Sequence, residues 1–153
     1  MQFKNKLHNY LISSEFDPEL LPPKEKRNFE EAGIFIKYKK NEVIYGEGSS
    51  PKGAYLLKKG MVKVIQVNSE GNEQIIFFFS PGEIFGFRAL LSNDKHVISA
   101  VCMESCEIKF IEAEVFIKLI ETSVTLTKQL LSRMCHEFSI LVNRINIYAQ
   151  KRN

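Results

Sequence analysis

The chain has 153 residues, of which 44% are hydrophobic and 25% are charged, and its formal net charge at pH 7 is +3. This length supports one well-buried core and is too short for two ample domains, so we expect one domain with an appendage. No apolar run reaches the roughly 18 residues that a membrane-spanning helix requires, and the N-terminal residues lack the apolar core of a secretion signal, which predicts a cytoplasmic protein with no membrane partner. The mild charge neither requires nor excludes a nucleic acid as partner.

Two short helices are expected before the first strand. Residues 3–12 carry apolar side chains at helical spacing, which suggests an amphipathic segment. Pro23 suits the first turn of a helix that runs through residues 24–31, and Gly33 ends it. Residues 1–33 are therefore predicted to form an N-terminal helical segment.

From Ile34 the apolar pattern changes to the alternation that is typical of strands. Two of these runs flank the polar turn at residues 68–71, which predicts a hairpin. Short strands separated by turn residues at intervals of about ten indicate an antiparallel sandwich or barrel over residues 34–111. The strand candidates are residues 34–38, 43–45, 55–57, 61–65, 74–79, 96–102 and 107–111.

Residues 112–153 are predicted to be helical. A brief helix opens at residues 112–114, and Ser123 or Thr125 caps a much longer one that extends to about Ala149. Apolar side chains recur on it every seven residues, which is typical of a two-stranded coiled coil. Because a small barrel covers only part of so long an apolar face, we favour pairing with a second copy over packing of the whole face on the chain's own barrel. The predicted dimer helix residues are Leu131, Met134, Phe138, Leu141 and Ile145.

The segment 75–100 has the features of a small-ligand cradle. It begins as an apolar run of strand length, is interrupted by a turn and resumes before a short helix at residues 87–91. Gly82 and Gly86 stand where positive φ or close backbone approach is easiest. The main-chain amides of residues 86–89 would open the short helix, an arrangement that favours anions.

Three stretches resemble the cyclic-nucleotide-binding domain: KNEVIYGEG (40–48), AYLLKKGMVKV (54–64), and PGEIFG (81–86) followed by ALL (89–91). The long helix after them is similar in placement to the dimer helix of the CRP/FNR transcription regulators. Several glycines at the family's spacing around matching strands make a specific signal. The resemblance implies a mainly β fold with flanking α-helices: a double-stranded β-helix, or jelly-roll barrel, followed by a long C-terminal dimerisation helix. It also implies a homodimer.

Two charged residues that bind the nucleotide in this family are missing from the matching positions. Nucleotide-binding members carry a Glu directly after the Phe-Gly pair, for the ribose hydroxyl, and an Arg before a Ser/Thr-Ala pair, for the cyclic phosphate. Here these positions hold Phe87 and Ile98. Charge-assisted bonds worth about 1.5–3 kcal/mol each are lost, so tight binding of cyclic AMP is not expected.

On the dimer helix, apolar residues likewise replace residues that bind the nucleotide in relatives. Leu141 and Val142 stand where cyclic-AMP-responsive relatives place the adjacent hydroxyl residues that reach the base. The pocket is therefore expected to bind a hydrophobic or differently charged effector, or to be packed shut. Its candidate residues are Phe77, Phe85, Gly86, Phe87, Arg88, Ala89, Ile98, Ser99, Ala100, Leu141 and Val142.

Two titratable residues in the cradle have alternative interpretations. Arg88 is the charged residue of the cradle motif and could approach an anion, but we favour a solvated side chain on the exposed side of a one-turn helix. His96 could titrate near neutral pH, although a loop histidine at this position is more often exposed to solvent.

No cofactor, metal or catalytic site is expected. Cys102, Cys106 and Cys135 lack a clear fourth ligand for an iron-sulfur cluster and are interpreted as buried structural thiols. The three histidines fall in different elements, which excludes the convergent metal ligands of the cupins and gives no axial ligand for haem. The sequence shows neither a Ser-His-Asp nor a Cys-His arrangement for nucleophilic catalysis, so we do not expect an enzyme.

Together these features predict the effector-sensing and dimerisation domain of a CRP/FNR-type regulator that does not respond to cyclic AMP. DNA would be bound only through a winged helix-turn-helix absent from this chain, and we favour a longer chain cut at the hinge over a natural sensor-only protein. The alternative is a stand-alone interaction or regulatory module with no DNA-binding role. In the favoured mechanism an unknown small-molecule effector shifts the packing of the dimer helix and so reorients a domain joined after it.

Overall fold

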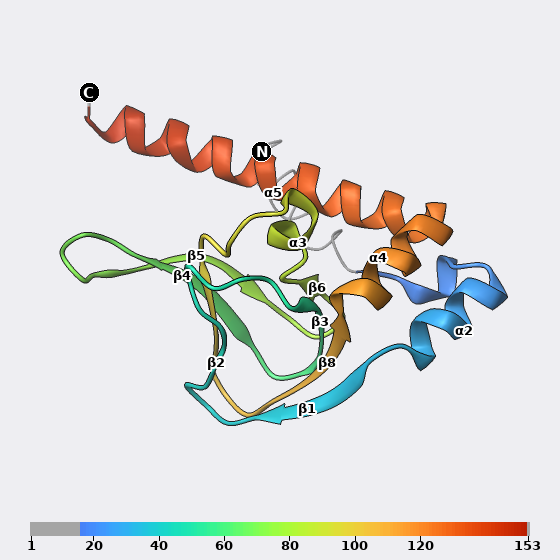
Figure 1. Ribbon diagram of the computed structural model, residues 1–153. Helices are drawn as coiled ribbons and strands as arrows, with labels where there is room; N and C mark the ends of the chain where they lie inside the picture. The colour runs from blue at the N-terminus through green and yellow to red at the C-terminus, as the bar shows by residue number, and fades with distance from the viewer. Residues whose placement is uncertain (1–15, 153) are drawn as a thin grey trace.

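The structure is a computed structural model that describes residues 16–152 (Figure 1). The amphipathic segment predicted at residues 3–12 lies outside this range. Among the described residues, no helix combines the length and the apolar character needed to cross a membrane. The elements are η1 (Pro18–Leu20), α2 (Pro23–Glu31), β1 (Ile34–Tyr38), β2 (Val43–Tyr45), β3 (Gly53–Lys59), β4 (Val62–Val67), β5 (Glu73–Phe79), β6 (Ile84–Phe85), α3 (Arg88–Ser92), β7 (Ser99–Cys102), β8 (Cys106–Glu112), α4 (Ala113–Thr122) and α5 (Val124–Arg152).

The strands form two antiparallel sheets of four, in the orders β1-β8-β3-β6 and β2-β7-β4-β5. Strands adjacent in a sheet are mostly distant in sequence, as in a jelly roll, and the predicted hairpin joins β4 to β5 with Val62 opposite Phe79. Figure 1 shows α5 lying across one end of the barrel. Helix α4 contacts both the barrel and α5, and α2 packs on α4. The predicted mainly β fold with a long C-terminal helix is therefore confirmed.

Two differences from the predicted strands occur around the cradle. β6 was not predicted, and β7 begins at Ser99 rather than at His96. The backbone of His96 is bonded to a loop instead of a strand, because its N–H donates to the Ser49 carbonyl at 2.9 Å and its carbonyl accepts from the Gly48 N–H at 2.7 Å. Residues 96–98 consequently border the cradle rather than extend the sheet.

The core has two parts. The barrel interior holds a set of aromatic rings, in which Phe85 lies 5.5 Å from Tyr55 and 5.0 Å from Phe79 between ring centres. The second part lies between the barrel and the helices, where Phe116 of α4 and Leu126 of α5 are 0% and 1% exposed. Burial of each large apolar side chain contributes about 1.5–3 kcal/mol, so both parts stabilise the position of α5 on the barrel.

The start of α5 is fixed by Ser123, one of the two predicted caps. Its hydroxyl accepts from the Leu126 N–H at 3.2 Å and donates to the Glu25 carboxylate of α2 at 3.0 Å. The cap satisfies an amide that has no partner within the helix. The helix then runs to Arg152, three residues beyond the predicted end.

Candidate effector pocket and dimer helix

A recess of about 190 Å³ opens beside α3. Its walls come from the end of β2, from α3 and from the loop that leads to β7. This volume is below the roughly 300–1,000 Å³ of pockets that hold drug-sized ligands. The lining residues are Tyr45, Gly86, Arg88, Ala89, Ser92, Asp94, Lys95, His96, Val97 and Ile98.

The structure brings four of the predicted pocket residues to this recess: Gly86, Arg88, Ala89 and Ile98. Phe77, Phe85 and Ala100 are instead buried in the barrel core, and Leu141 of α5 packs against the same cluster. Ser99 is used by the barrel itself, because its hydroxyl accepts from the Glu47 N–H at 2.8 Å. Val142 is 39% exposed.

Phe87 does not line the recess. Its side chain is 3% exposed and belongs to the second core cluster, where its ring centre lies 6.1 Å from that of Phe116. The residue after the Phe-Gly pair therefore anchors α3 to the helical layer. Together with the buried Ile98, it leaves both nucleotide-gripping positions of the family without charge.

His96 is buried, contrary to the expected solvent exposure. Its side chain is 5% exposed, and its ring stacks on Tyr45 at 3.9 Å between ring centres with an interplanar angle of 14°. Burial lowers the pKa of His96 and raises that of Tyr45, because both charged forms lose hydration. Nothing in the local sequence indicates this, since the stacking partner comes from β2.

Arg88 is not freely solvated, contrary to the favoured prediction. Its side chain is 36% exposed, and its Nη1 lies 3.7 Å from Oε2 of Glu137 on α5. Arg88 therefore lies between the recess and the long helix. Sequence reasoning missed Glu137, because an acidic residue within a long helix is ordinarily taken as solvated.

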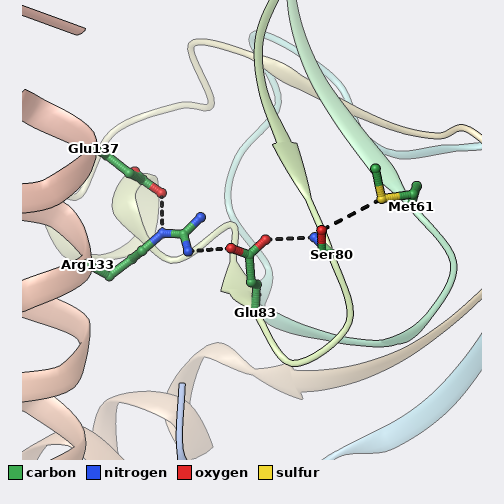
Figure 2. A network of polar contacts seen from close by, with 5 residues as sticks. All are labelled: Met61, Ser80, Glu83, Arg133 and Glu137. Carbon is green, nitrogen blue, oxygen red and sulfur yellow. Dashed lines mark hydrogen bonds and ion pairs between the residues drawn. The ribbon is translucent and has the colours of Figure 1, made fainter. Parts of the chain in front are cut away.

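Glu137 belongs to a buried ionic network that joins α5 to the turn before β6, as Figure 2 shows. Arg133 donates through Nε to Glu137 Oε1 at 2.9 Å and through Nη1 to Glu83 Oε1 at 2.5 Å. The second oxygen of Glu83 accepts from the Ser80 N–H at 2.7 Å. Burial opposes the charge of Arg133, but the two carboxylates outweigh it and raise the pKa of the guanidinium. Glu83, in the turn before β6, thus supplies a carboxylate that pairs with Arg133 and attaches α5 to the barrel.

Two arginines of α5 also cover the rings of β5. The guanidinium of Arg133 lies 5.5 Å from the ring centre of Phe79, and that of Arg144 lies 5.3 Å from the ring centre of Phe77. Arg144 Nη1 additionally donates to the Ile76 carbonyl. Cation–π contacts and hydrogen bonds therefore attach one face of α5 to the barrel along several turns.

The opposite face of α5 is apolar and exposed. Leu131, Phe138 and Ile145, spaced by seven residues, are 59%, 69% and 66% exposed. Met134 and Leu141, which were predicted at the intermediate seam positions, pack against the chain's own core clusters. Cys135 and Val142 are also exposed and recur at the position four residues after Leu131 and Phe138. We therefore define the outer seam as Leu131, Cys135, Phe138, Val142 and Ile145.

The cysteines agree with the prediction in part. Cys102 and Cys106 are buried, whereas Cys135 is exposed. Burial, followed by the neighbouring Cys106, raises the pKa of Cys102 to about 12, so its thiolate is scarce at neutral pH. Within residues 16–152 no three His, Cys, Asp or Glu side chains are placed to hold a metal ion.

The jelly roll with its cradle and long helix matches a known class of sensor domain. A family model described as the cyclic nucleotide-binding domain matches residues 35–123. This match covers more than half of the chain, so the chain belongs to the cyclic nucleotide-binding domain family. The resemblance to CRP/FNR regulators is also confirmed, because known regulators of that family are among its relatives.

Regulatory protein HlyX of Actinobacillus pleuropneumoniae is 35% identical over 74 residues, which are 46% of this chain and 30% of that protein. The cyclic AMP receptor protein of Thermus thermophilus is 29% identical over 83 residues, 54% of this chain and 38% of that protein. Among solved structures, the Thermus thermophilus catabolite activator protein superposes with a TM-score of 0.63 at 24% identity, covering 89% of this chain and 61% of that one. The matched segments are thus only about a third of the two curated relatives' length.

Proposed function

We propose that this chain is the effector-sensing and dimerisation region of a CRP/FNR-type transcription regulator, that it is not an enzyme, and that it does not respond to cyclic AMP. The observation that carries the proposal is the buried, uncharged state of Phe87 and Ile98, at 3% and 8% exposure. A cyclic phosphate in the family's binding position would meet no charged partner at these two residues, so the cost of removing its hydration would not be offset there.

The packing of the barrel supports the same conclusion. Phe77, Phe85 and Leu141, which were predicted to line an effector pocket, are packed in or against the barrel core. A purine nucleotide would need these side chains to move out of a close-packed cluster. The remaining recess of about 190 Å³ suits a much smaller effector.

The output is proposed to pass through the dimer. The outer seam of α5 leaves large apolar side chains in water, and a second copy covers them when the same seam pairs in parallel, as in a coiled coil. A change at the recess would then alter the packing of α5 and reorient a DNA-binding domain joined after it. The segments are proposed to be 1–33 for the N-terminal helices, 34–111 for the barrel and 112–153 for the short and dimer helices.

Titration calorimetry with cyclic AMP tests the specificity. We expect no saturable heat at ligand concentrations up to about 1 mM, where binding energies near 4 kcal/mol would still be detected. The cyclic AMP receptor protein of Thermus thermophilus, measured in parallel, is the positive control. Micromolar binding of cyclic AMP to this chain would overturn the proposal.

The native cysteines test the dimer. Cys135 is exposed on the outer seam, while Cys102 and Cys106 are buried. A short thiol-to-thiol crosslinker should therefore join two chains through Cys135, and Cys135→Ser should abolish the crosslink. A monomer by sedimentation, or a dimer that crosslinks equally without Cys135, would contradict the parallel seam.

A further inference from the structure

Arg88 gives the recess beside α3 a positive wall. The guanidinium is a cationic group, and about a third of the side chain is open to solvent. Lys95 and Asp94 also line the recess, and Asp94 Oδ1 already accepts from the Lys95 N–H at 2.7 Å. Arg88 and Lys95 outnumber Asp94, so the formal charge of the lining is positive even though His96, whose pKa is lowered by burial, adds none.

The ion pair of Arg88 within the chain is a loose one. Its Nη1 is 3.7 Å from Glu137 Oε2, whereas charge-assisted N–H···O bonds are about 2.7–2.9 Å long. A planar guanidinium presents two parallel donors that fit a carboxylate or a phosphate. Arg88 therefore has donors to offer an anion in the recess, and Glu137 competes for them only weakly.

Glu137 has a second cationic partner besides Arg88. Its other oxygen accepts from Arg133 Nε at 2.9 Å, and Arg133 is held in turn by Glu83. Loss of Arg88 would thus leave the buried carboxylate paired. The energetic penalty that ordinarily results from breaking a buried ion pair is correspondingly reduced.

We propose that the recess binds a small anion, carrying a carboxylate or a phosphate, on Arg88, and that Glu137 is the competitor for this arginine within the chain. The inference rests on the proposed function as an effector sensor and names the chemical class of the effector. A recess of about 190 Å³ has room for a short organic acid or inorganic phosphate.

Binding of such an anion would be coupled to α5. Arg88 is on α3 and Glu137 is on α5, so an anion that takes Arg88 removes this ion pair between the recess and the long helix. The contacts of Arg133 and Arg144 remain and keep α5 on the barrel. Occupancy is thereby linked to the attachment of the helix that carries the outer seam.

The test is calorimetric titration of the full 153-residue chain at constant ionic strength, with inorganic phosphate in one arm and succinate in the other. We expect saturable binding in at least one arm, which identifies the anion class. Arg88→Gln should weaken it at least about tenfold, the usual effect of removing a charge-assisted partner. Lys118→Gln removes the same charge from the exposed side of α4 and should leave the affinity unchanged.

A second pair of variants tests the competition. Glu137→Gln removes a carboxylate from both Arg88 and Arg133, whereas Glu83→Gln removes one from Arg133 alone. We expect the first to tighten anion binding several-fold and the second to leave it unchanged. If Arg88→Gln fails to fold, Arg88→Lys keeps the charge without the planar fork and should still weaken binding.

The proposal is overturned if neither anion binds, if Lys118→Gln weakens binding as much as Arg88→Gln, or if Glu137→Gln weakens it. A dimer that binds neither cyclic AMP nor either anion would leave the proposed function standing and refute this inference alone. Binding of cyclic AMP would instead refute the proposed function.

Discussion

The two glycines of the cradle differ in how closely other atoms approach them. Gly82 and Gly86 both have positive φ, +94° and +78°. A Cβ on Gly82 would meet nothing within 4 Å, whereas a Cβ on Gly86 would lie 2.7 Å from Cδ2 of Tyr55. Tyr55 is part of the aromatic core and stacks on Phe85, so its ring cannot move without disturbing that core. Gly86 is therefore required by space as well as by backbone conformation.

We predict that Gly86→Ala destabilises the chain much more than Gly82→Ala. Positive φ alone should cost about 1–2 kcal/mol in both variants. The clash with Tyr55 should add about 1–3 kcal/mol in Gly86→Ala only. Urea unfolding at one protein concentration measures both free energies, and equal losses would contradict the steric argument.

His96 should make stability depend on pH. Its pKa is lowered from the ordinary 6.5 by burial, so the unfolded chain binds more protons in the interval between the folded pKa and 6.5. The free energy of unfolding should therefore fall as the pH is lowered through that interval. His96→Phe retains a ring against Tyr45 and should lose this part of the dependence. Urea unfolding from about pH 8 to about pH 5 compares the two, and parallel curves would refute the assignment.

The long helix α5 has two faces with different surroundings. Its inner face is fixed by buried apolar side chains, by the ionic network of Arg133 and by Arg144 over Phe77. Its outer face exposes Leu131, Phe138 and Ile145. A helix of 29 residues is too long for a small barrel to cover on every side, so the heptad pattern belongs to the outer face.

Arg133 should be the most sensitive charged residue of α5. Arg133→Met leaves two carboxylates with 11% and 8% exposure without their shared cation. Breaking a buried pair in this way costs about 3–5 kcal/mol. Lys128→Met, at an exposed position of the same helix, is the matched control and should stay within about 0.5 kcal/mol of the wild type. Thermal and urea unfolding measure the difference, and a loss below about 1 kcal/mol in Arg133→Met would show that the network is not stabilising.

At the scale of the whole molecule, the exposed seam is the surface through which we propose that the chain associates. Monomeric proteins rarely expose so many large apolar side chains along one line. Pairing two outer seams would bury Phe138 near the centre of the contact, where truncations in interfaces have their largest effect. The recess and the ionic network then connect α3 to the helix that carries the proposed dimer seam.

Phe138→Asp should dissociate the proposed dimer. The substitution places two like charges in an apolar seam, which should weaken association by at least about 2 kcal/mol. Asn143→Asp introduces the same charge at an exposed position outside the seam and should leave the dimer intact. Sedimentation over a dilution series measures both, and an unchanged dimer in Phe138→Asp would contradict the seam.

Much of this architecture was determined by the sequence alone. Alternation of apolar residues located the strands, because a strand packed on one face must alternate. Pro23, Gly33 and Ser123 set the ends of helices, because these residues have local backbone or capping requirements. The glycines of the cradle identified the family, and the uncharged Phe87 and Ile98 led to the proposal that cyclic AMP is not bound.

Only the tertiary structure decided which residues share the recess and which share the core. His96 stacks on Tyr45 of β2, and Arg88 meets Glu137 of α5; neither partner is close in sequence. Phe87 and Leu141 looked like pocket residues and proved to be core residues, because their direction depends on how α3 and α5 pack. The seven-residue spacing alone did not distinguish Met134 and Leu141, which pack against the core, from Cys135 and Val142, which are exposed. Local sequence sets backbone conformation, whereas the direction and partners of a side chain depend on elements that meet only in the folded chain.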